Sequence, residues 1–229
     1  MGIRRGSIST PIIADGLVFN MDAANRASYP ETGTTATDTV NSMVGTLNGA
    51  TFNNSNLGAW NFDGTDDYIN IPDNNTLDFT SKMSGEIWLN FTSLGTNDLL
   101  LWKTNSYGIA YNATFTGNDA NRLGVAVQSS GWKGAQFDQA ISTGTWYCLS
   151  FTFNTPNLKC YLNGVLGETN TGASGGIATT SNPLRVGIDV GGSSTYAFQG
   201  LIGNVHLYNR ELSANEVLHN YNALKSRFE

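Results

Sequence analysis

The sequence has little charge, little proline and little cysteine. Charged residues make up 13% of the 229 residues, and the chain has five prolines and two cysteines. The formal net charge of −6 leaves no basic field that would attract a phosphate backbone or an anionic lipid surface. We therefore expect neither a nucleic-acid partner nor a membrane partner.

Long apolar runs are also missing. No run approaches the ~18 residues that a membrane-spanning helix requires. Arg4 and Arg5 give the start of the chain positive charge, but Pro11 and Asp15 follow where a signal peptide needs an unbroken apolar region. The sequence thus predicts a soluble chain without a secretion signal.

Glycine, by contrast, is abundant, with 26 residues. Turn dipeptides such as Asp63-Gly64 separate short runs in which apolar and polar residues alternate, as at Ile87, Leu89 and Phe91. This rhythm is typical of half-buried β-strands joined by tight turns. At this length, a single all-β sandwich is the simplest interpretation.

One predicted hairpin has a register that two independent signals support. A tight turn at 154–157 would pair six apolar residues on one face. The pairs are Phe153 with Leu158, Phe151 with Cys160, and Leu149 with Leu162. The same register places Cys148 on the face opposite Cys160, a separation that no disulfide spans. We expect two free thiols, which suit a reducing cytoplasm, although a β-bulge would shift the register and leave a disulfide open.

The last segment predicts a helix. Ser213 and Glu216 have the spacing of a capping box. Four apolar residues then repeat at helical spacing: Val217, Leu218, Tyr221 and Leu224. We expect a helix over 213–226. The first residues show no period of either kind, so the sequence predicts an N-terminal arm over 1–14 and one domain over 15–229.

Four segments resemble, in their order and spacing, the laminin-G-like jelly-roll family of the concanavalin-A-like lectin/glucanase superfamily. They are FDGTDDYINIP (62–72), LKCYLNGVLG (158–167), NPLRVG (182–187) and FQGLIGNVHLYNRELSANEV (198–217). The resemblance implies an all-β jelly-roll sandwich of two antiparallel sheets, with about six or seven strands each, and one C-terminal helix. It also implies loop rims that hold sugar, and often calcium, in lectin relatives.

Two further segments resemble a narrower set, the laminin-G-like structural proteins of tailed bacteriophages: GLVFNMDAANRASYP (16–30) and HNYNALKSRF (219–228). This resemblance implies a non-enzymatic virion protein, assembled in the host cytoplasm as a capsid decoration or an appendage. Its partners would be other capsid or tail proteins, and the chain would form a homo-oligomer on the particle. The arm would anchor the domain through Arg4 and Arg5, and the jelly roll would face outward.

Several aromatic residues could offer flat apolar faces on which sugar rings stack. The candidates are Trp132, Trp102, Tyr107, Tyr111 and Tyr196. Most aromatic residues of a sandwich lie in its core, but the small and polar residues on both sides of Trp132 predict an exposed loop tip. Trp132 is therefore the first candidate for a sugar or protein contact. The alternative function is a carbohydrate-binding adhesion module that recognises host-surface glycans.

The densest group of carboxylates comprises Asp63, Asp66, Asp67 and Asp73. Hard oxygen ligands suit calcium, and Asp63 and Asp66 are the candidate ligands. The other interpretation is turn chemistry, since Asp63-Gly64 is typical of an Asx-type turn between strands. Calcium-binding members of the family are similar in having an acidic residue before the VxxYNR motif, where this chain has Gly203 and Asn204.

The sequence carries no signature of catalysis. The glucanase branch places paired acids along one strand in an ExDxxE pattern, which this chain lacks. Trp88 and Asn90 follow Glu86 where partner acids would stand, so we expect Glu86 to be an exposed strand residue. His206 and His219 have neither the context of a nucleophile nor the spacing of a zinc site, and we expect structural roles. The sequence therefore predicts that the protein is not an enzyme.

Overall fold

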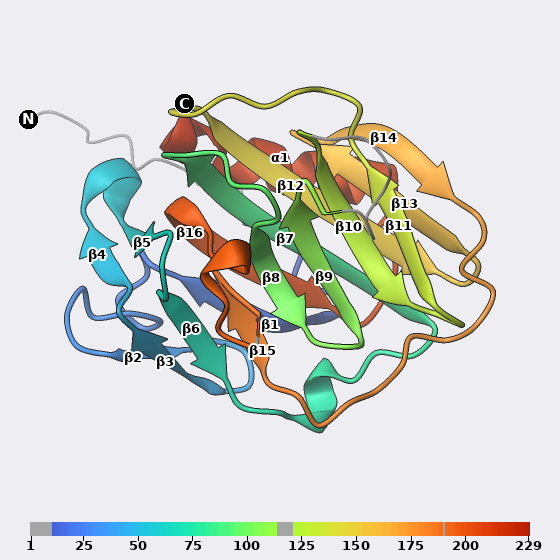
Figure 1. Ribbon diagram of the computed structural model, residues 1–229, viewed down its shortest axis with the longest axis horizontal. Helices are drawn as coiled ribbons and strands as arrows, with labels where there is room; N and C mark the ends of the chain where they lie inside the picture. Colours follow the sequence, from blue (N-terminus) through green and yellow to red (C-terminus); the bar gives the residue numbers. More distant parts are fainter. Residues whose placement is uncertain (1–10, 114–120, 190) are drawn as a thin grey trace, which may run out of the picture.

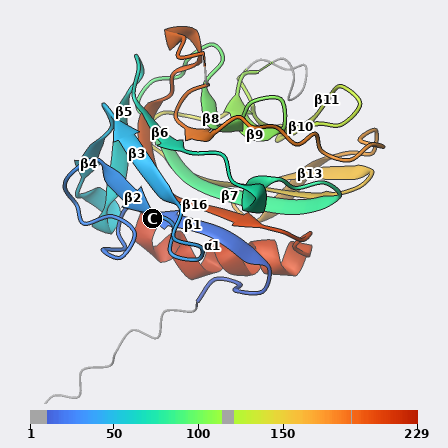
Figure 2. The ribbon, with the colours of Figure 1, turned by 90° about the horizontal axis from the view of Figure 1, so that it is seen from below.

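The computed structural model describes residues 11–113, 121–189 and 191–229. The described chain forms two antiparallel β-sheets that pack face to face, followed by one α-helix (Figure 1). Figure 2 shows this helix, α1 (Ala214–Phe228), against the outer side of one sheet. The predicted jelly-roll sandwich with a C-terminal helix is confirmed.

Sheet A, on the side of α1, has the order β14-β13-β12-β7-β16-β5-β4, with β1 paired to β16. Its strands are β1 (Leu17–Asp22), β4 (Thr51–Asn53), β5 (Ala59–Asp63), β7 (Lys82–Phe91), β12 (Trp146–Asn154), β13 (Asn157–Leu162), β14 (Val165–Asn170) and β16 (Gln199–Tyr208). In the described chain sheet A thus has eight strands, more than the six or seven expected, because it includes the three-residue edge strand β4.

Sheet B has the order β11-β10-β9-β8-β15-β6-β3-β2. Its strands are β2 (Thr35–Thr37), β3 (Val44–Asn48), β6 (Tyr68–Ile71), β8 (Leu99–Lys103), β9 (Tyr107–Tyr111), β10 (Leu123–Gln128), β11 (Trp132–Gln136) and β15 (Leu184–Val186). Three short 3-10 helices lie in the connections: η1 (Ser55–Leu57), η2 (Asn75–Leu77) and η3 (Ser194–Tyr196).

The hairpin β12–β13 has the predicted register. Its core-facing pairs are Phe153 with Leu158, Phe151 with Cys160, and Leu149 with Leu162. All six side chains are buried between the sheets. Cys148 lies on the opposite face of β12, and burial raises the pKa of both the Cys148 and the Cys160 thiol. Both cysteines are free, so this prediction is confirmed.

The core lies between the two sheets, and β9 shows how the sequence builds it. Tyr107, Ile109 and Tyr111 point into the core, because residues two apart on a strand share a face. Gly108 and Ala110 alternate with them and face the outer side of sheet B. Each large apolar side chain that is fully buried stabilises the fold by roughly 2–3 kcal/mol. The outer side of β9 is left with small residues.

The helix α1 begins with the predicted capping box. The Ser213 side chain accepts a hydrogen bond from the Glu216 backbone, and the Glu216 carboxylate accepts one from the Ser213 backbone. The helix ends at Phe228, beyond the predicted end at 226, because Phe228 stacks on Trp88 of sheet A with ring centroids 4.4 Å apart. Within the described chain, no helix combines the length and the apolar character needed to cross a membrane.

The structure describes only residues 11–14 of the predicted arm. Arg4 and Arg5 lie outside the described residues. The Ile13 backbone donates a hydrogen bond to Asn220 Oδ1 of α1 at 2.9 Å. Residues 11–14 therefore reach the helix side of the molecule, away from sheet B, while the boundary between an arm and a domain stays a prediction.

Candidate functional site

The outer face of sheet B carries a row of residues that cross-strand pairing places side by side. The row runs Thr46, Asn70, Arg185, Trp102, Gly108, Ala126 and Gly134. On β9, β10 and β11 the row has only small side chains. On β6 and β15 it is polar, where the Arg185 guanidinium lies 4.3 Å from the centroid of the Tyr68 ring and donates a hydrogen bond to Asn70 at 3.2 Å. The outer face thus divides into two halves. The half over β9, β10 and β11, referred to as the low half, has small side chains, and the half over β6 and β15 is polar.

Two tryptophans stack on the low half. Gly108 makes room for Trp102, because a Cβ atom on Gly108 would overlap the Trp102 ring. Trp132 stacks on Trp102 with ring centroids 5.0 Å apart and planes inclined by 26°. The surrounding cluster, referred to below as the aromatic platform, comprises Leu99, Trp102, Ala110, Ala113 and Ala126, with Trp132 and Tyr196 packed against it.

The aromatic residues of the platform differ in exposure. Trp102 is 4% exposed, so it supports Trp132 from below and presents almost no face of its own. Trp132 does not lie at the predicted loop tip: it is the first residue of β11, paired with Gln128, and it is partly exposed. Tyr196 in η3 is also partly exposed. Trp132 and Tyr196 are therefore the two predicted contacts that can meet a ligand, and Trp102 positions one of them.

The prediction that Tyr107 contacts a sugar is wrong. Tyr107 is fully buried, its hydroxyl donates a hydrogen bond to the Leu77 carbonyl at 3.1 Å, and its ring packs edge-on against Phe79. Tyr111, weighed beside it, is also fully buried. The sequence held the signal for this placement, because Tyr107, Ile109 and Tyr111 alternate with the small residues of β9.

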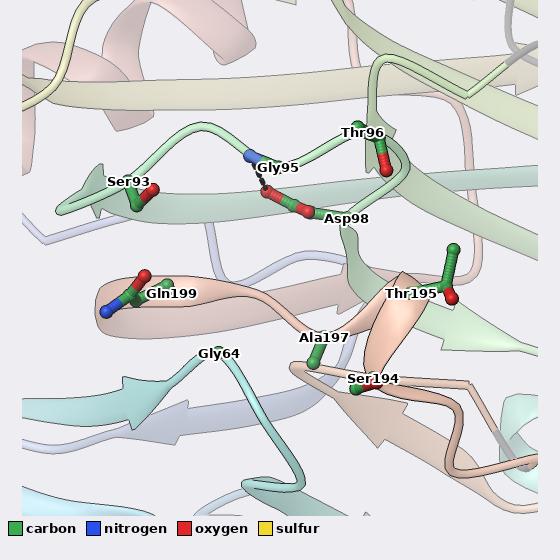
Figure 3. Close-up of a pocket in the computed structure, with 9 residues that line it drawn as sticks. All are labelled: Gly64, Ser93, Gly95, Thr96, Asp98, Ser194, Thr195, Ala197 and Gln199. Atoms are coloured by element: carbon green, nitrogen blue, oxygen red, sulfur yellow. Dashed lines mark hydrogen bonds between the residues drawn. The ribbon is translucent and has the colours of Figure 1, made fainter.

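The structure also has a polar hollow of about 210 Å³, referred to as the rim hollow (Figure 3). Figure 3 shows the loop between β7 and β8 on one side of it, and η3 with the start of β16 on the other. Its polar lining includes Ser93, Thr96, Asp98, Ser194, Thr195 and Gln199. Asp98 and Thr195 directly precede the platform residues Leu99 and Tyr196. The lining of the rim hollow and the platform are therefore neighbours along the chain at these two places.

Asp98 is the buried acid of the rim hollow. It is 2% exposed, and its carboxylate accepts a hydrogen bond from the Gly95 backbone at 3.1 Å (Figure 3). Burial raises the pKa of Asp98 from 3.8 to about 6, while hydrogen bonds from the Gly95 and Asn97 backbone oppose the rise. At neutral pH Asp98 is thus a carboxylate that can accept hydrogen bonds from hydroxyl groups.

Nothing in the sequence singled out the rim hollow. Its residues are Gly, Ser, Thr and Gln of ordinary loops, and they come from segments that are distant in the chain. The one available signal is Asp98 itself, an acid that directly precedes the apolar run of β8. Such an acid at a strand end is common, so pairing of the strands was needed to reveal the site.

The aspartates of the turn after β5 do gather. One carboxylate oxygen from each of Asp63, Asp66 and Asp67 lies within 4.8 Å of the others, and Asp67 joins the two predicted ligands. Burial raises the pKa of Asp67. The Asp67 carboxylate accepts a hydrogen bond from the Asp63 backbone N–H at 2.8 Å, which opposes the rise. Asp63 also accepts from the Thr65 backbone at 2.7 Å, which is the turn chemistry that was the other interpretation. The remaining oxygens of this triad could hold a cation such as calcium.

Asp73, the fourth acid of that group, lies apart from the triad and pairs with Lys103.

The expectations for Glu86 and His219 have different outcomes. Glu86 is not exposed: it is 1% exposed beneath α1, where it accepts a hydrogen bond from Ser150 at 3.2 Å and lies 3.4 Å from His206. The expectation of an exposed Glu86 is wrong, because the helix covers the outer face of sheet A. His219 lies 2.9 Å from the Pro11 carbonyl, a structural contact.

The two packed sheets place the protein among the lectin-like jelly-roll domains. A family model described as the concanavalin A-like lectin/glucanases superfamily matches residues 63–218 of the sequence. The chain belongs to this superfamily. No curated protein sequence matches the chain significantly.

Solved structures share the fold at low sequence identity. Domain 4 of AbnA, a GH43 extracellular arabinanase from Geobacillus stearothermophilus solved with arabinotriose, is 19% identical, with 90% of this chain and 98% of that chain covered and a TM-score of 0.70. The binding domain of Paraclostridial Mosquitocidal Protein 1 is 15% identical, with 91% and 52% covered and a TM-score of 0.70. The binding domain of botulinum neurotoxin DC, in complex with SialylT, is 16% identical, with 92% and 52% covered and a TM-score of 0.68.

The chain spans about half the length of the two toxin binding domains. At these identities, the likeness establishes the fold and leaves the ligand to be argued from the residues of this chain.

Proposed function

We propose that the protein is a carbohydrate-binding domain whose ligand lies on the aromatic platform and reaches into the rim hollow. The observation that carries this proposal is that Asp98 and Thr195 of the rim hollow directly precede Leu99 and Tyr196 of the platform. The platform offers a partly exposed Trp132 that stacks on Trp102, and the rim hollow offers the buried carboxyl of Asp98. A flat apolar surface beside convergent polar groups is what a sugar ring requires.

Each half of the surface would serve one side of a sugar. The C–H face of a ring stacks on an aromatic ring such as Trp132, while hydroxyl groups need hydrogen-bond partners at the ring edge. Asp98 accepts hydrogen bonds, and the side chains of Ser93 and Thr195 can both donate and accept.

Two structural neighbours agree with this ligand class. The arabinanase domain was solved with arabinotriose, and the neurotoxin domain was solved with SialylT. We extend the proposal to binding without catalysis, in keeping with the missing ExDxxE pattern and with the burial of Glu86 beneath α1.

A glycan array followed by calorimetry tests the proposal. We expect a short set of related glycans to bind, and Trp132→Ala to reduce affinity by at least about tenfold, since each ~1.4 kcal/mol of lost interaction is tenfold. Trp146→Ala is the matched control, because Trp146 is a partly exposed tryptophan beside α1 on the opposite side of the sandwich. Equal affinities for the Trp132 variant and the wild type, or no binding to any glycan, would contradict the proposal.

The second candidate function is a structural role on a phage particle. The resemblance of 16–30 and 219–228 to tailed-phage proteins supports a structural role on a virion, as a capsid decoration or appendage that contacts other capsid or tail proteins as a homo-oligomer. The geometry favours display, because Ile13 contacts α1, whereas the aromatic platform lies on sheet B (Figure 2). A domain held through its N-terminal side would present the platform outward.

Truncation tests this second function. Removal of residues 1–10 preserves the contact between Ile13 and Asn220, so the domain should keep its melting temperature. We expect the truncated protein to be missing from purified particles, and Arg4→Ala combined with Arg5→Ala to weaken incorporation. Normal incorporation of the truncated chain would refute anchoring by the arm and leave the carbohydrate-binding proposal untouched.

A further inference from the structure

A lysine and two aspartates meet at the end of sheet B that the proposed ligand surface does not use. Lys103, the last residue of β8, has a fully buried side chain. Its Nζ lies 2.5 Å from Asp73 Oδ1 and 3.4 Å from Asp78 Oδ1. The same Nζ donates a hydrogen bond to the Asn182 carbonyl at 3.0 Å. The amine is thus held against one carboxylate with a second carboxylate beside it.

Buried residues shield the lysine of this site from water, while its two aspartates are partly exposed. Lys103 lies between strands at the edge of the main core, and Tyr107 and Phe79, which pack edge-on with centroids 5.4 Å apart, are buried nearby on β9 and after η2. Asp73 and Asp78 keep 31% and 21% of their side chains exposed. Among the described residues, Asp78 Oδ1 is buried and has no hydrogen-bond partner, and its ion-pair contact is Lys103 Nζ at 3.4 Å.

We propose that Lys103 and Asp73 condense to form an intramolecular isopeptide bond, with Asp78 carrying the proton. The bond would join Nζ of Lys103 to Cγ of Asp73. Proximity of this kind converts a slow bimolecular amide formation into an intramolecular step. The buried amine, the carboxyl in contact with it and the adjacent second carboxyl supply the three groups that the step requires.

The step balances without any co-reactant. A proton first passes from the Lys103 ammonium to the Asp73 carboxylate, which replaces a buried ion pair by a neutral amine and a neutral acid. The nitrogen lone pair then attacks Cγ of Asp73, and the Asp78 carboxylate takes a proton from the nitrogen. Asp78 returns that proton to the departing hydroxyl, the C–O bond breaks, and one water molecule leaves. The products are one amide and one water, with Asp78 unchanged.

Such a bond would close a loop in a chain whose two thiols are free. Lys103 and Asp73 are 30 positions apart, so the bond would tie the crossover after β6 to β8. A covalent closure of this kind limits the unfolded chain in the way that a disulfide does. It needs no oxidant, which suits a protein without a disulfide between Cys148 and Cys160.

Intact-mass spectrometry of the folded full chain tests the proposal. We expect a mass lower than that of the sequence by one water molecule. A tryptic digest should contain a branched peptide that joins the stretch around Asp73 to the stretch around Lys103, without cleavage after Lys103. The ion pair of Lys159 with Glu211 is an internal control, because its nitrogen and oxygen lie 2.8 Å apart but both side chains are more exposed to water than that of Lys103. Its peptides should stay separate.

Variants assign the roles. Lys103→Arg keeps the positive charge but cannot form the amide, so its mass should equal that of its sequence. Asp78→Asn should lose water at least about a hundredfold more slowly, the usual contribution of a proton-transferring group. Both variants are first shown to fold by circular dichroism and by their melting temperatures.

Three results would overturn the proposal. The first is a folded wild type with the full sequence mass. The second is a loss of water that persists in Lys103→Arg, which would indicate a cyclic imide between Asp73 and Asn74. The third is an Asp78→Asn variant that reacts as fast as the wild type, which would remove Asp78 from the reaction.

Discussion

Arg227 and Asp22, 205 positions apart in the chain, form an ion pair in which Arg227 Nη1 lies 2.8 and 2.9 Å from the two carboxylate oxygens. The other guanidinium nitrogens donate to the carbonyls of Asn56, at 2.8 Å, and Gly58, at 2.6 Å. One side chain of α1 thus fastens the end of β1 and the segment around η1. The two segments that resemble phage proteins meet at this ion pair.

Arg227→Met should therefore lower the free energy of unfolding by about 2–4 kcal/mol, because it leaves Asp22 and two backbone carbonyls without their donor. Arg227→Lys should recover little, since an ammonium group cannot reach three separated acceptors. Urea denaturation measures both. Arg26→Ala is the control, because the Arg26 side chain that pairs with Glu31 is 73% exposed, so its loss should change stability by less than about 0.5 kcal/mol.

The stacking of Trp132 on Trp102 depends on the absence of a side chain at Gly108. A Cβ atom there would overlap Trp102 and lie 2.6 Å from the Leu101 carbonyl, so the ring or the strand must move. We expect Gly108→Ala to lower the free energy of unfolding by about 1–3 kcal/mol and to weaken glycan binding. Gly191→Ala, with open space around its Cβ position, should be neutral in thermal melts. A neutral Gly108→Ala variant would show that Trp102 is free to shift.

Local signals were sufficient for the parts of the fold that short stretches of chain determine. The register of β12–β13 followed from a turn and an apolar pattern that agree, and α1 followed from the capping box of Ser213 and Glu216. Neither feature needs a distant partner. No local signal indicated which face of the sandwich α1 would cover. Glu86 was therefore expected to be exposed to solvent, whereas it is buried beneath the helix.

The candidate site depended more strongly on pairing between distant strands. Trp132 was predicted as a contact from its sequence neighbours, but its support by Trp102 arises only when β8, β9, β10 and β11 align. The rim hollow joins residues as far apart as Ser93 and Thr195. The spacing of such residues along the chain carries no period, so only the folded sheet order brings them together.

The two tryptophans of the platform should separate stability from binding. Trp102 is 4% exposed, so Trp102→Ala should lower the free energy of unfolding by about 3–5 kcal/mol, as large cavities do. Trp132 is partly exposed, and its truncation should cost only about 1–2 kcal/mol, from the lost stacking and the smaller buried area. Denaturant melts and glycan affinities of both variants test this. Equal destabilisation would mean that Trp132 is a core residue and not a contact.

Asp98 makes the stability of the fold depend on pH in a definite direction. Burial raises the pKa of Asp98 from 3.8 to about 6, so between these values the folded protein binds a proton that the unfolded chain has released. The contribution of Asp98 to stability therefore falls as the pH rises from about 4 to about 6, and above that window it costs at most about 3 kcal/mol.

Asp98→Asn removes the charge but keeps an oxygen that can accept the hydrogen bond from Gly95. We expect this variant to be more stable than the wild type at pH 8 and similar to it at pH 4, where both side chains are neutral. Asp138→Asn is the control, because that side chain is 90% exposed and should shift stability little at either pH. If Asp98→Asn were instead less stable at pH 8, the carboxylate would be held by interactions stronger than its burial. If Asp98 also binds hydroxyl groups, the stabilised variant should bind glycan more weakly, which is the trade expected of a group kept for a ligand.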